Sequence, residues 1–264
     1  MLKTKEFLSS LPQYVLKGCD IRIPDKVIRK LFTFAELTSS DVVYHLGCGG
    51  SRTVTIAAEE FKVKKSVGIE TKEEGKPETD RTIENTNKTE IIIGDIRKIS
   101  ISDATVLLFL NSDPKTVEVM VPRFENELKD GTRIISILYP PDLMLPTKVN
   151  FPFFMFQKPF IYAKRLEEQI DVIFGKQCID FVGSWLMVER YIDELRVVPI
   201  QHRRFVNMFQ SMVIWINAWN TGVACEKEIP PHVHSYLGIL RTFFNIDMSD
   251  LISSKRMKRL AGNI

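Results

Sequence analysis

The chain has 264 residues, of which 44% are apolar and 26% are charged, and its formal net charge at pH 7 is +3. A chain of this length and composition can bury one large or two modest cores, so it needs no disulfide or metal to fold. The small net charge gives no indication of a nucleic-acid partner, and no apolar run approaches the roughly 20 residues of a membrane span.

The N-terminus and the cysteines indicate where the protein resides. The first residues, MLKTKEFLSSLPQY, lack the apolar centre of a signal peptide. The four cysteines are far apart and form no C-x-x-C pair, which is typical of reduced intracellular thiols. We therefore expect a cytoplasmic protein with the free cysteines Cys19, Cys48, Cys178 and Cys225.

The first 160 residues alternate between strand and helix patterns. Pro24 and Asp25 open a helical pattern that continues to Leu37, and further helices are expected near 51–61 and 114–129. Short apolar runs predict strands at 42–46, 66–70, 90–94, 104–110 and 132–138. Residues 149–160 add a last strand, which Pro152 interrupts. This alternation predicts an α/β fold with a doubly wound, Rossmann-like parallel sheet.

The segment from Asp41 to Glu70 reads as strand, glycine turn, helix and strand, which is half of a nucleotide-type binding site. It lacks the lysine of a phosphate-binding loop. The third glycine of a dinucleotide fingerprint is replaced by Arg52, which disfavours NAD without excluding it. The remaining pattern, two glycines and the acidic Glu70 about 20 positions later, suits a ligand with a ribose and an adenine but no phosphate. S-adenosylmethionine is the common ligand of this kind.

Residues 22–139 carry a specific order of motifs: HLGCGGSRT from the end of the first strand, VGIE ending the second, IIIGDI, DATVLLFL, and PRFENELKDGTRIIS. In this order and spacing the chain resembles class I S-adenosylmethionine-dependent methyltransferases, in particular the small archaeal protein-lysine methyltransferases. The resemblance implies a cofactor site in which Gly47 and Gly49 frame the methionine part, Glu70 the ribose, Asp95 and Ile96 the adenine, and Asn111 the substrate entrance.

The chain departs from that family at the end of the first strand. The family pattern D-L-G-C-G-D-G has two carboxylates, whereas this chain has His45 and Gly50 at those positions and Ser51 in place of the last glycine. His45 either accepts a hydrogen bond from the cofactor's ammonium through a neutral imidazole or satisfies a backbone group. In the first case, an ordinary histidine pKa predicts weaker binding at pH 6 than at pH 8. The segment after Glu70 also lacks the apolar residues of the family's next helix.

From about residue 161 the apolar spacing becomes helical and continues almost to the C-terminus, with breaks at Pro199 and at Pro230 and Pro231. We predict a methyltransferase-like domain at 1–160 and a helical domain at 161–264, which selects the substrate, dimerises, or covers the ligand edge. His232 and His234 lie on different sides of a helix, so no metal site is predicted.

Two hypotheses follow. The first is a methyltransferase that uses S-adenosylmethionine, with a protein lysine as a possible acceptor and no catalytic base identified. The second is a non-catalytic scaffold with a methyltransferase-like sheet, whose helical region binds other proteins. The loss of the two carboxylates and of the helix after Glu70 favours the second.

Overall fold

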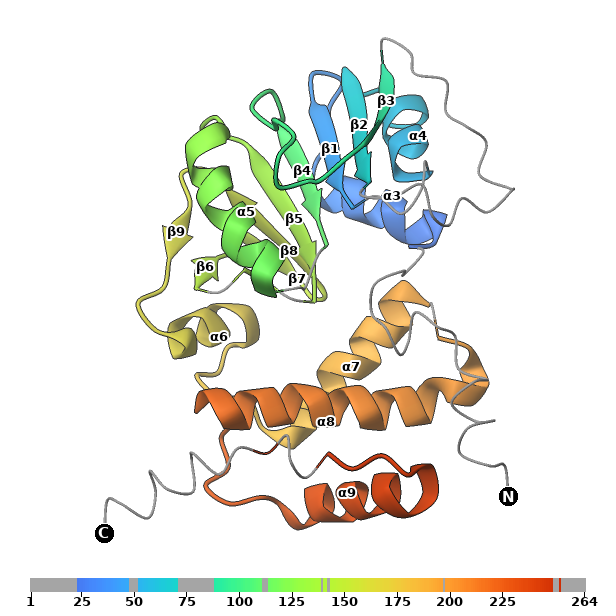
Figure 1. The fold of residues 1–264 in the computed structure, drawn as a ribbon, viewed down its shortest axis with the longest axis vertical. Coiled ribbons are helices and arrows are strands. Elements are labelled where there is room, and N and C mark those ends of the chain that lie inside the picture. The colour runs from blue at the N-terminus through green and yellow to red at the C-terminus, as the bar shows by residue number, and fades with distance from the viewer. Residues whose placement is uncertain are drawn as a thin grey trace. The chain divides into compact units, whose positions relative to one another are not determined.

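The computed structural model describes residues 23–47, 52–70, 88–110, 114–138, 140–141, 143–196, 198–248 and 252. They form two compact units, one that ends at Lys164 and one that begins at Arg165 (Figure 1).

The first unit is built on a seven-stranded sheet with the strand order β3-β2-β1-β4-β5-β8-β7. Neighbouring strands from β3 to β5 are parallel, whereas β8 and β7 are antiparallel to their neighbours. The predicted Rossmann-like sheet is therefore confirmed. The strands are β1 (Val42–Leu46), β2 (Lys65–Glu70), β3 (Thr89–Ile93), β4 (Val106–Phe109), β5 (Arg133–Ile137), β7 (Lys148–Asn150) and β8 (Phe153–Gln157).

Helices cover both faces of this sheet (Figure 1). One face packs against α3 (Asp25–Phe34) and α4 (Arg52–Glu59), and the other packs against α5 (Pro114–Glu127), where the rings of Phe109 and Phe124 meet edge to face at 5.2 Å. Because both faces are covered, all five residues of β1 are buried. This burial explains why the central strands read as continuous apolar runs in the sequence.

Two boundaries differ from the sequence prediction. Helix α3 ends at Phe34, three residues before Leu37, because Glu36 adopts a left-handed conformation with φ 55°. The Leu37 N–H then bonds the Phe32 carbonyl, as in a Schellman cap. The strand expected at 149–160 is instead the hairpin of β7 and β8, which turns at Phe151 and Pro152.

The second unit is helical, as predicted, but it begins later than residue 161. Ile161 and Tyr162 form a short strand, β9 (Ile161–Tyr162), paired with β6 (Met144–Leu145). Trp215 and Trp219 are almost completely buried at the centre of the helical core. The helices are α6 (Leu166–Phe174), α7 (Phe181–Leu195), a 3-10 turn (Ile200–His202), α8 (Arg203–Thr221) and α9 (Pro231–Phe244).

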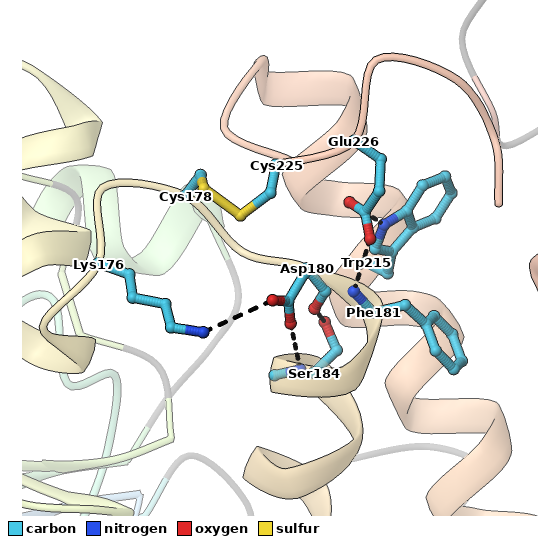
Figure 2. Close-up of a disulfide and its surroundings, with 9 residues drawn as sticks. Lys176, Cys178, Asp180, Phe181, Ser184, Trp215, Cys225 and Glu226 are labelled. Carbon is cyan, nitrogen blue, oxygen red and sulfur yellow. Dashed lines mark hydrogen bonds and ion pairs between the residues drawn. A yellow bond between two sulfur atoms is a disulfide. The ribbon is translucent and has the colours of Figure 1, made fainter.

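The expectation of four reduced cysteines is wrong for two of them. Cys178, just before α7, and Cys225, between α8 and α9, form a disulfide across 47 positions of sequence (Figure 2). The two segments pair at an isolated bridge, in which the Ile179 N–H bonds the Val223 carbonyl and the Cys225 N–H bonds the Ile179 carbonyl. Sequence spacing gives no indication of this contact, because it depends on how α7 and α8 pack. Cys19 and Cys48 lie outside the described residues.

The same junction carries a carboxylate that joins two helices (Figure 2). Glu226 accepts a hydrogen bond from the Phe181 N–H at 2.9 Å and another from the Trp215 indole N–H at 3.0 Å. Asp180 caps α7 by accepting from the Gly183 N–H. The start of α7 is therefore held by a cap, a carboxylate from the α8–α9 segment and a covalent bond.

Candidate functional site

The glycine turn after β1 and the turn after β3 meet at the carboxyl end of β2. The Gly47 N–H donates to the Ile69 carbonyl at 2.8 Å, and the Gly94 N–H donates to the Glu70 carbonyl at 2.7 Å. The consecutive carbonyls of Ile69 and Glu70 therefore bind the segments that follow the neighbouring strands β1 and β3. In an open parallel sheet, ligands bind beyond this edge of the strands.

Gly47 makes the backbone of this edge accessible. Its φ is +76°, a conformation that other residues rarely adopt, and a Cβ built on it would meet no atom of the described residues within 4 Å. The glycine is therefore required by conformation, and the space beside it allows a ligand to approach the main chain. Gly49, Gly50 and Ser51 lie outside the described residues.

His45 is buried on the face of β1 that packs against α4, and its side chain is 4% exposed. Its Nδ1 bonds the hydroxyl of Thr53, in the first turn of α4, at 2.7 Å. Its Nε2 is buried and has no hydrogen-bond partner within the described part of the chain. Burial lowers the pKa of His45 to about 4, so the imidazole is neutral at physiological pH. The hydrogen bond it makes is to a side-chain hydroxyl and not to a backbone group.

Glu70 is the last residue of β2 and is half-buried. It pairs in register with Ile93 of β3, so its backbone is fixed on the β3 side by the sheet and by Gly94. A carboxylate at this position can accept two hydrogen bonds from a ribose diol.

Asp95 and Ile96 begin a tight turn after β3. The Asp95 carbonyl accepts from the Lys98 N–H at 2.9 Å, and its carboxylate accepts from the Arg97 N–H at 2.9 Å. The Arg97 guanidinium also bonds this carboxylate, and these hydrogen bonds lower the pKa of Asp95 to about 2. The side chain of Ile96 is buried beneath the turn.

No model of a known protein family matches the chain. Among solved structures, it is similar to an RNA methyltransferase from Salinibacter ruber, in complex with S-adenosyl-L-homocysteine, with a TM-score of 0.48 and 23% identity over 55% of this chain and 99% of that one. It is also similar to human N-acetylserotonin methyltransferase, in complex with S-adenosylmethionine, with a TM-score of 0.34 and 15% identity over 45% of this chain and 34% of that one.

A sequence relative is more informative. The chain is 39% identical over 117 residues to a protein-lysine N-methyltransferase of Saccharolobus islandicus (strain REY15A), and the match covers 43% of this chain and 71% of that protein. The chain belongs to the class I S-adenosylmethionine-dependent methyltransferase family. The family resemblance drawn from the motifs is thereby confirmed, together with the fold it implies.

The predicted site residues that the structure describes lie at one edge of the methyltransferase sheet. Gly47 follows β1, Glu70 is the last residue of the adjacent strand β2, and Asp95 lies two residues after β3. His45 lies in β1, two residues before Gly47. The structure therefore brings the segments of these residues together, whereas Gly49 and Asn111 lie outside the described residues.

The sequence reasoning missed Arg123, on α5 of the methyltransferase unit. Its guanidinium donates to the carbonyls of Ile96 and Ile99, each at 2.6 Å, and forms an ion pair with Glu127. The available signal was a basic residue four positions before an acidic one on an otherwise amphipathic helix. That spacing alone does not reveal which loop lies beneath the guanidinium.

His232 and His234 both lie on α9 of the helical unit. His232 is exposed on α9 and its ring packs at 4.9 Å from the ring of Phe181. Within the described ranges, no three or more His, Cys, Asp or Glu side chains are grouped so that they could hold a metal ion. None of the described helices is both long and apolar enough to cross a membrane.

Proposed function

We propose that this methyltransferase binds S-adenosylmethionine at the carboxyl edge of β1, β2 and β3 and methylates a lysine of another protein. The observation that carries the proposal is the pair of hydrogen bonds that joins the Gly47 and Gly94 turns to consecutive carbonyls of β2. The proposed cofactor-binding residues are His45, Gly47, Gly49, Glu70, Asp95, Ile96 and Asn111.

The described residues fit this cofactor in two respects. The Nε2 of His45 is a buried polar atom without a partner in the described part of the chain, and such an atom costs about 1–3 kcal/mol unless a ligand or another group satisfies it. The space beside Gly47 admits a ligand to the backbone. A neutral imidazole also avoids repulsion of the cofactor's positively charged sulfonium and ammonium groups.

Methyl transfer requires the chain mainly to position the cofactor and the acceptor. Bound S-adenosylmethionine supplies an electrophilic methyl group for direct transfer to a nucleophile. The residues of the sheet edge hold the donor and exclude water, and orientation of the acceptor provides most of the rate enhancement. A lysine amine must lose its proton before it reacts, and desolvation in a closed site favours the neutral amine. The helical unit is proposed to select the protein substrate.

A protein lysine is proposed as the acceptor because of the relative from Saccharolobus islandicus, whose name states that activity. The test is transfer of a labelled methyl group to a lysine-rich protein, followed by mass spectrometry of the modified residues. A substrate with acetylated lysines is the matched control, because acetylation removes the nucleophile and leaves the backbone unchanged. Label on residues other than lysine, or equal labelling of the control, contradicts this acceptor.

Cofactor binding is tested separately by calorimetric titration of S-adenosylmethionine and S-adenosylhomocysteine at pH 6 and pH 8. Because burial lowers the pKa of His45 to about 4, the imidazole keeps the same neutral form at both values. We therefore expect the same affinity at pH 6 and pH 8, and not the loss at pH 6 that an ordinary histidine predicts.

Two substitutions separate the nitrogens of His45. Asparagine places its amide near the Nδ1 position and retains the bond to Thr53, whereas glutamine extends to the Nε2 position. If Nε2 contacts the cofactor, His45→Asn weakens binding about tenfold and His45→Gln weakens it less. Equal affinities in both variants and the parent would show that His45 does not contact the ligand. No heat from the parent at millimolar ligand would favour the scaffold hypothesis, which the histidine in place of a carboxylate supports.

A further inference from the structure

In the turn that follows β3, hydrogen bonds at both the C=O and the N–H of a peptide unit fix its orientation. A peptide unit is planar, so its C=O and N–H point in opposite directions and fixing one directs the other. In the unit that joins Ile96 to Arg97, Arg123 binds the carbonyl at 2.6 Å and the Asp95 carboxylate binds the N–H at 2.9 Å. This plane is therefore held at both ends.

The preceding peptide unit presents a donor. The Asp95 carbonyl points into the turn, where it accepts from the N–H groups of Lys98 and Ile99 at 2.9 Å and 3.3 Å. The N–H of Ile96 belongs to the same plane and points the opposite way. It donates no hydrogen bond to a backbone carbonyl of the described residues. The Ile96 N–H can donate to a ring nitrogen, and the Asp95 carboxylate beside it can accept from an amino group. Adenine carries such a ring nitrogen next to its amino group.

Arg123 is itself held in place. Its Nε and one terminal nitrogen bond the two carboxylate oxygens of Glu127 at 2.5 Å and 2.8 Å, and its side chain is 16% exposed. The second carbonyl it binds belongs to Ile99, whose side chain packs against Gly94. A guanidinium with five donors in one plane can serve both carbonyls and the carboxylate at once, whereas a lysine ammonium cannot reproduce this geometry.

We propose that Arg123 is a positioning residue that holds the Asp95–Ile99 turn in the shape that recognises adenine. This inference rests on the proposed function, because it assigns the adenine to the same turn. It adds that recognition depends on a residue of α5 that has no contact with the ligand.

Hydrogen exchange in the ligand-free protein tests, without any cofactor, whether Arg123 holds the Asp95–Ile99 turn in place. Arg123→Met removes the donors and keeps most of the side-chain volume, and Arg123→Lys keeps the charge. We expect amide exchange of residues 97–99 to become at least about tenfold faster in Arg123→Met, with a smaller increase in Arg123→Lys. Lys129→Met, which removes an exposed charge shortly after α5, is the matched control and should leave these amides unchanged.

Ligand discrimination tests the consequence for binding. S-inosylhomocysteine differs from S-adenosylhomocysteine in its base, where a ring N–H replaces the acceptor and a carbonyl replaces the amino group. The parent should prefer the adenine compound by about tenfold or more, and Arg123→Met should bring the ratio of the two dissociation constants to within about threefold. A general loss of stability lowers both affinities but leaves their ratio unchanged.

The outcomes separate the two proposals. If the parent does not bind S-adenosylhomocysteine, the proposed function and the adenine role both fail, while the exchange rates still decide whether Arg123 holds the turn. If the parent binds and Arg123→Met alters neither the exchange rates nor the ratio, the positioning role is wrong. If Arg123→Met does not fold, Arg123→Lys and Glu127→Gln decide the question with the same two measurements.

Discussion

The disulfide between Cys178 and Cys225 closes a loop across 47 positions of the helical unit, and we expect its removal to destabilise that unit strongly. Cross-linking lowers the entropy of the unfolded chain by an amount that grows with the logarithm of the loop length. For a loop of this size the stabilisation is about 4 kcal/mol at 25 °C. The perturbation is the double substitution of both cysteines by serine, which leaves no unpaired thiol at the junction.

Tryptophan fluorescence is a selective probe of this unit. All three tryptophans of the chain, Trp185, Trp215 and Trp219, lie in α7 and α8, and the last two are almost completely buried. With a denaturant dependence of about 2 kcal/mol per molar urea, the loss of about 4 kcal/mol lowers the midpoint of the fluorescence transition by about 2 M. Reductant should lower the midpoint of the parent by a similar amount.

The double-serine variant is also the control for the reductant. A reductant that lowers its midpoint as much as that of the parent acts on something other than this bond. The chain-entropy reasoning is refuted if the parent and the variant unfold at the same urea concentration, or if the parent is unaffected by a reductant that is shown by thiol titration to open the bond.

Two further substitutions test hydrogen-bonded carboxylates, one in each unit. Asp41 accepts hydrogen bonds from Thr105, Thr38 and Arg133, and these bonds outweigh the effect of burial and lower the pKa of Asp41. The ionised carboxylate therefore stabilises the fold at pH values above the ordinary aspartate pKa. This stabilisation is lost as the pH falls through the lowered pKa. Asp41→Asn should cost about 3 kcal/mol at pH 7 and less at pH 3, measured by urea unfolding of the sheet unit followed by circular dichroism. Glu226→Gln replaces one of the two accepting oxygens by an NH2 group, which is a donor and faces an N–H. The midpoint of the fluorescence transition should therefore fall by an amount equivalent to about 1–3 kcal/mol. An unchanged midpoint would contradict the role assigned to the carboxylate.

The sheet was predictable because burial on both faces leaves a strong signal in the sequence. The strands at 42–46 and 66–70 read as short apolar runs, and the helices of the second unit repeat apolar residues at helical spacing. The hairpin at Phe151 and Pro152 was read as one interrupted strand, because apolar composition does not distinguish a strand with a break from two strands joined by a turn. The disulfide was missed for a different reason, since no local pattern records which loops approach after packing.

The positions at the site were predictable, but their interactions were not. Gly47, Glu70 and Asp95 could be placed because each lies at or just after the end of a strand, and parallel strands bring such residues to one edge. The bond between His45 and Thr53 depends on the orientation of α4 against β1, and the contacts of Arg123 depend on the packing of α5 over the turn after β3. Both arise from the packing of helices on the sheet, which apolar periodicity indicates only in outline.

These contacts also change how the site is expected to recognise its ligand. His45 replaces a carboxylate and is neutral, and the Asp95 carboxylate already binds the Arg97 guanidinium, so these two residues add no net negative charge to the edge. Electrostatic attraction of a positively charged cofactor by His45 and Asp95 is then weak. Affinity must come largely from directed hydrogen bonds of backbone groups, and such bonds require a rigid turn. A positioning residue such as Arg123 is therefore most important in a site where charge contributes little to cofactor affinity.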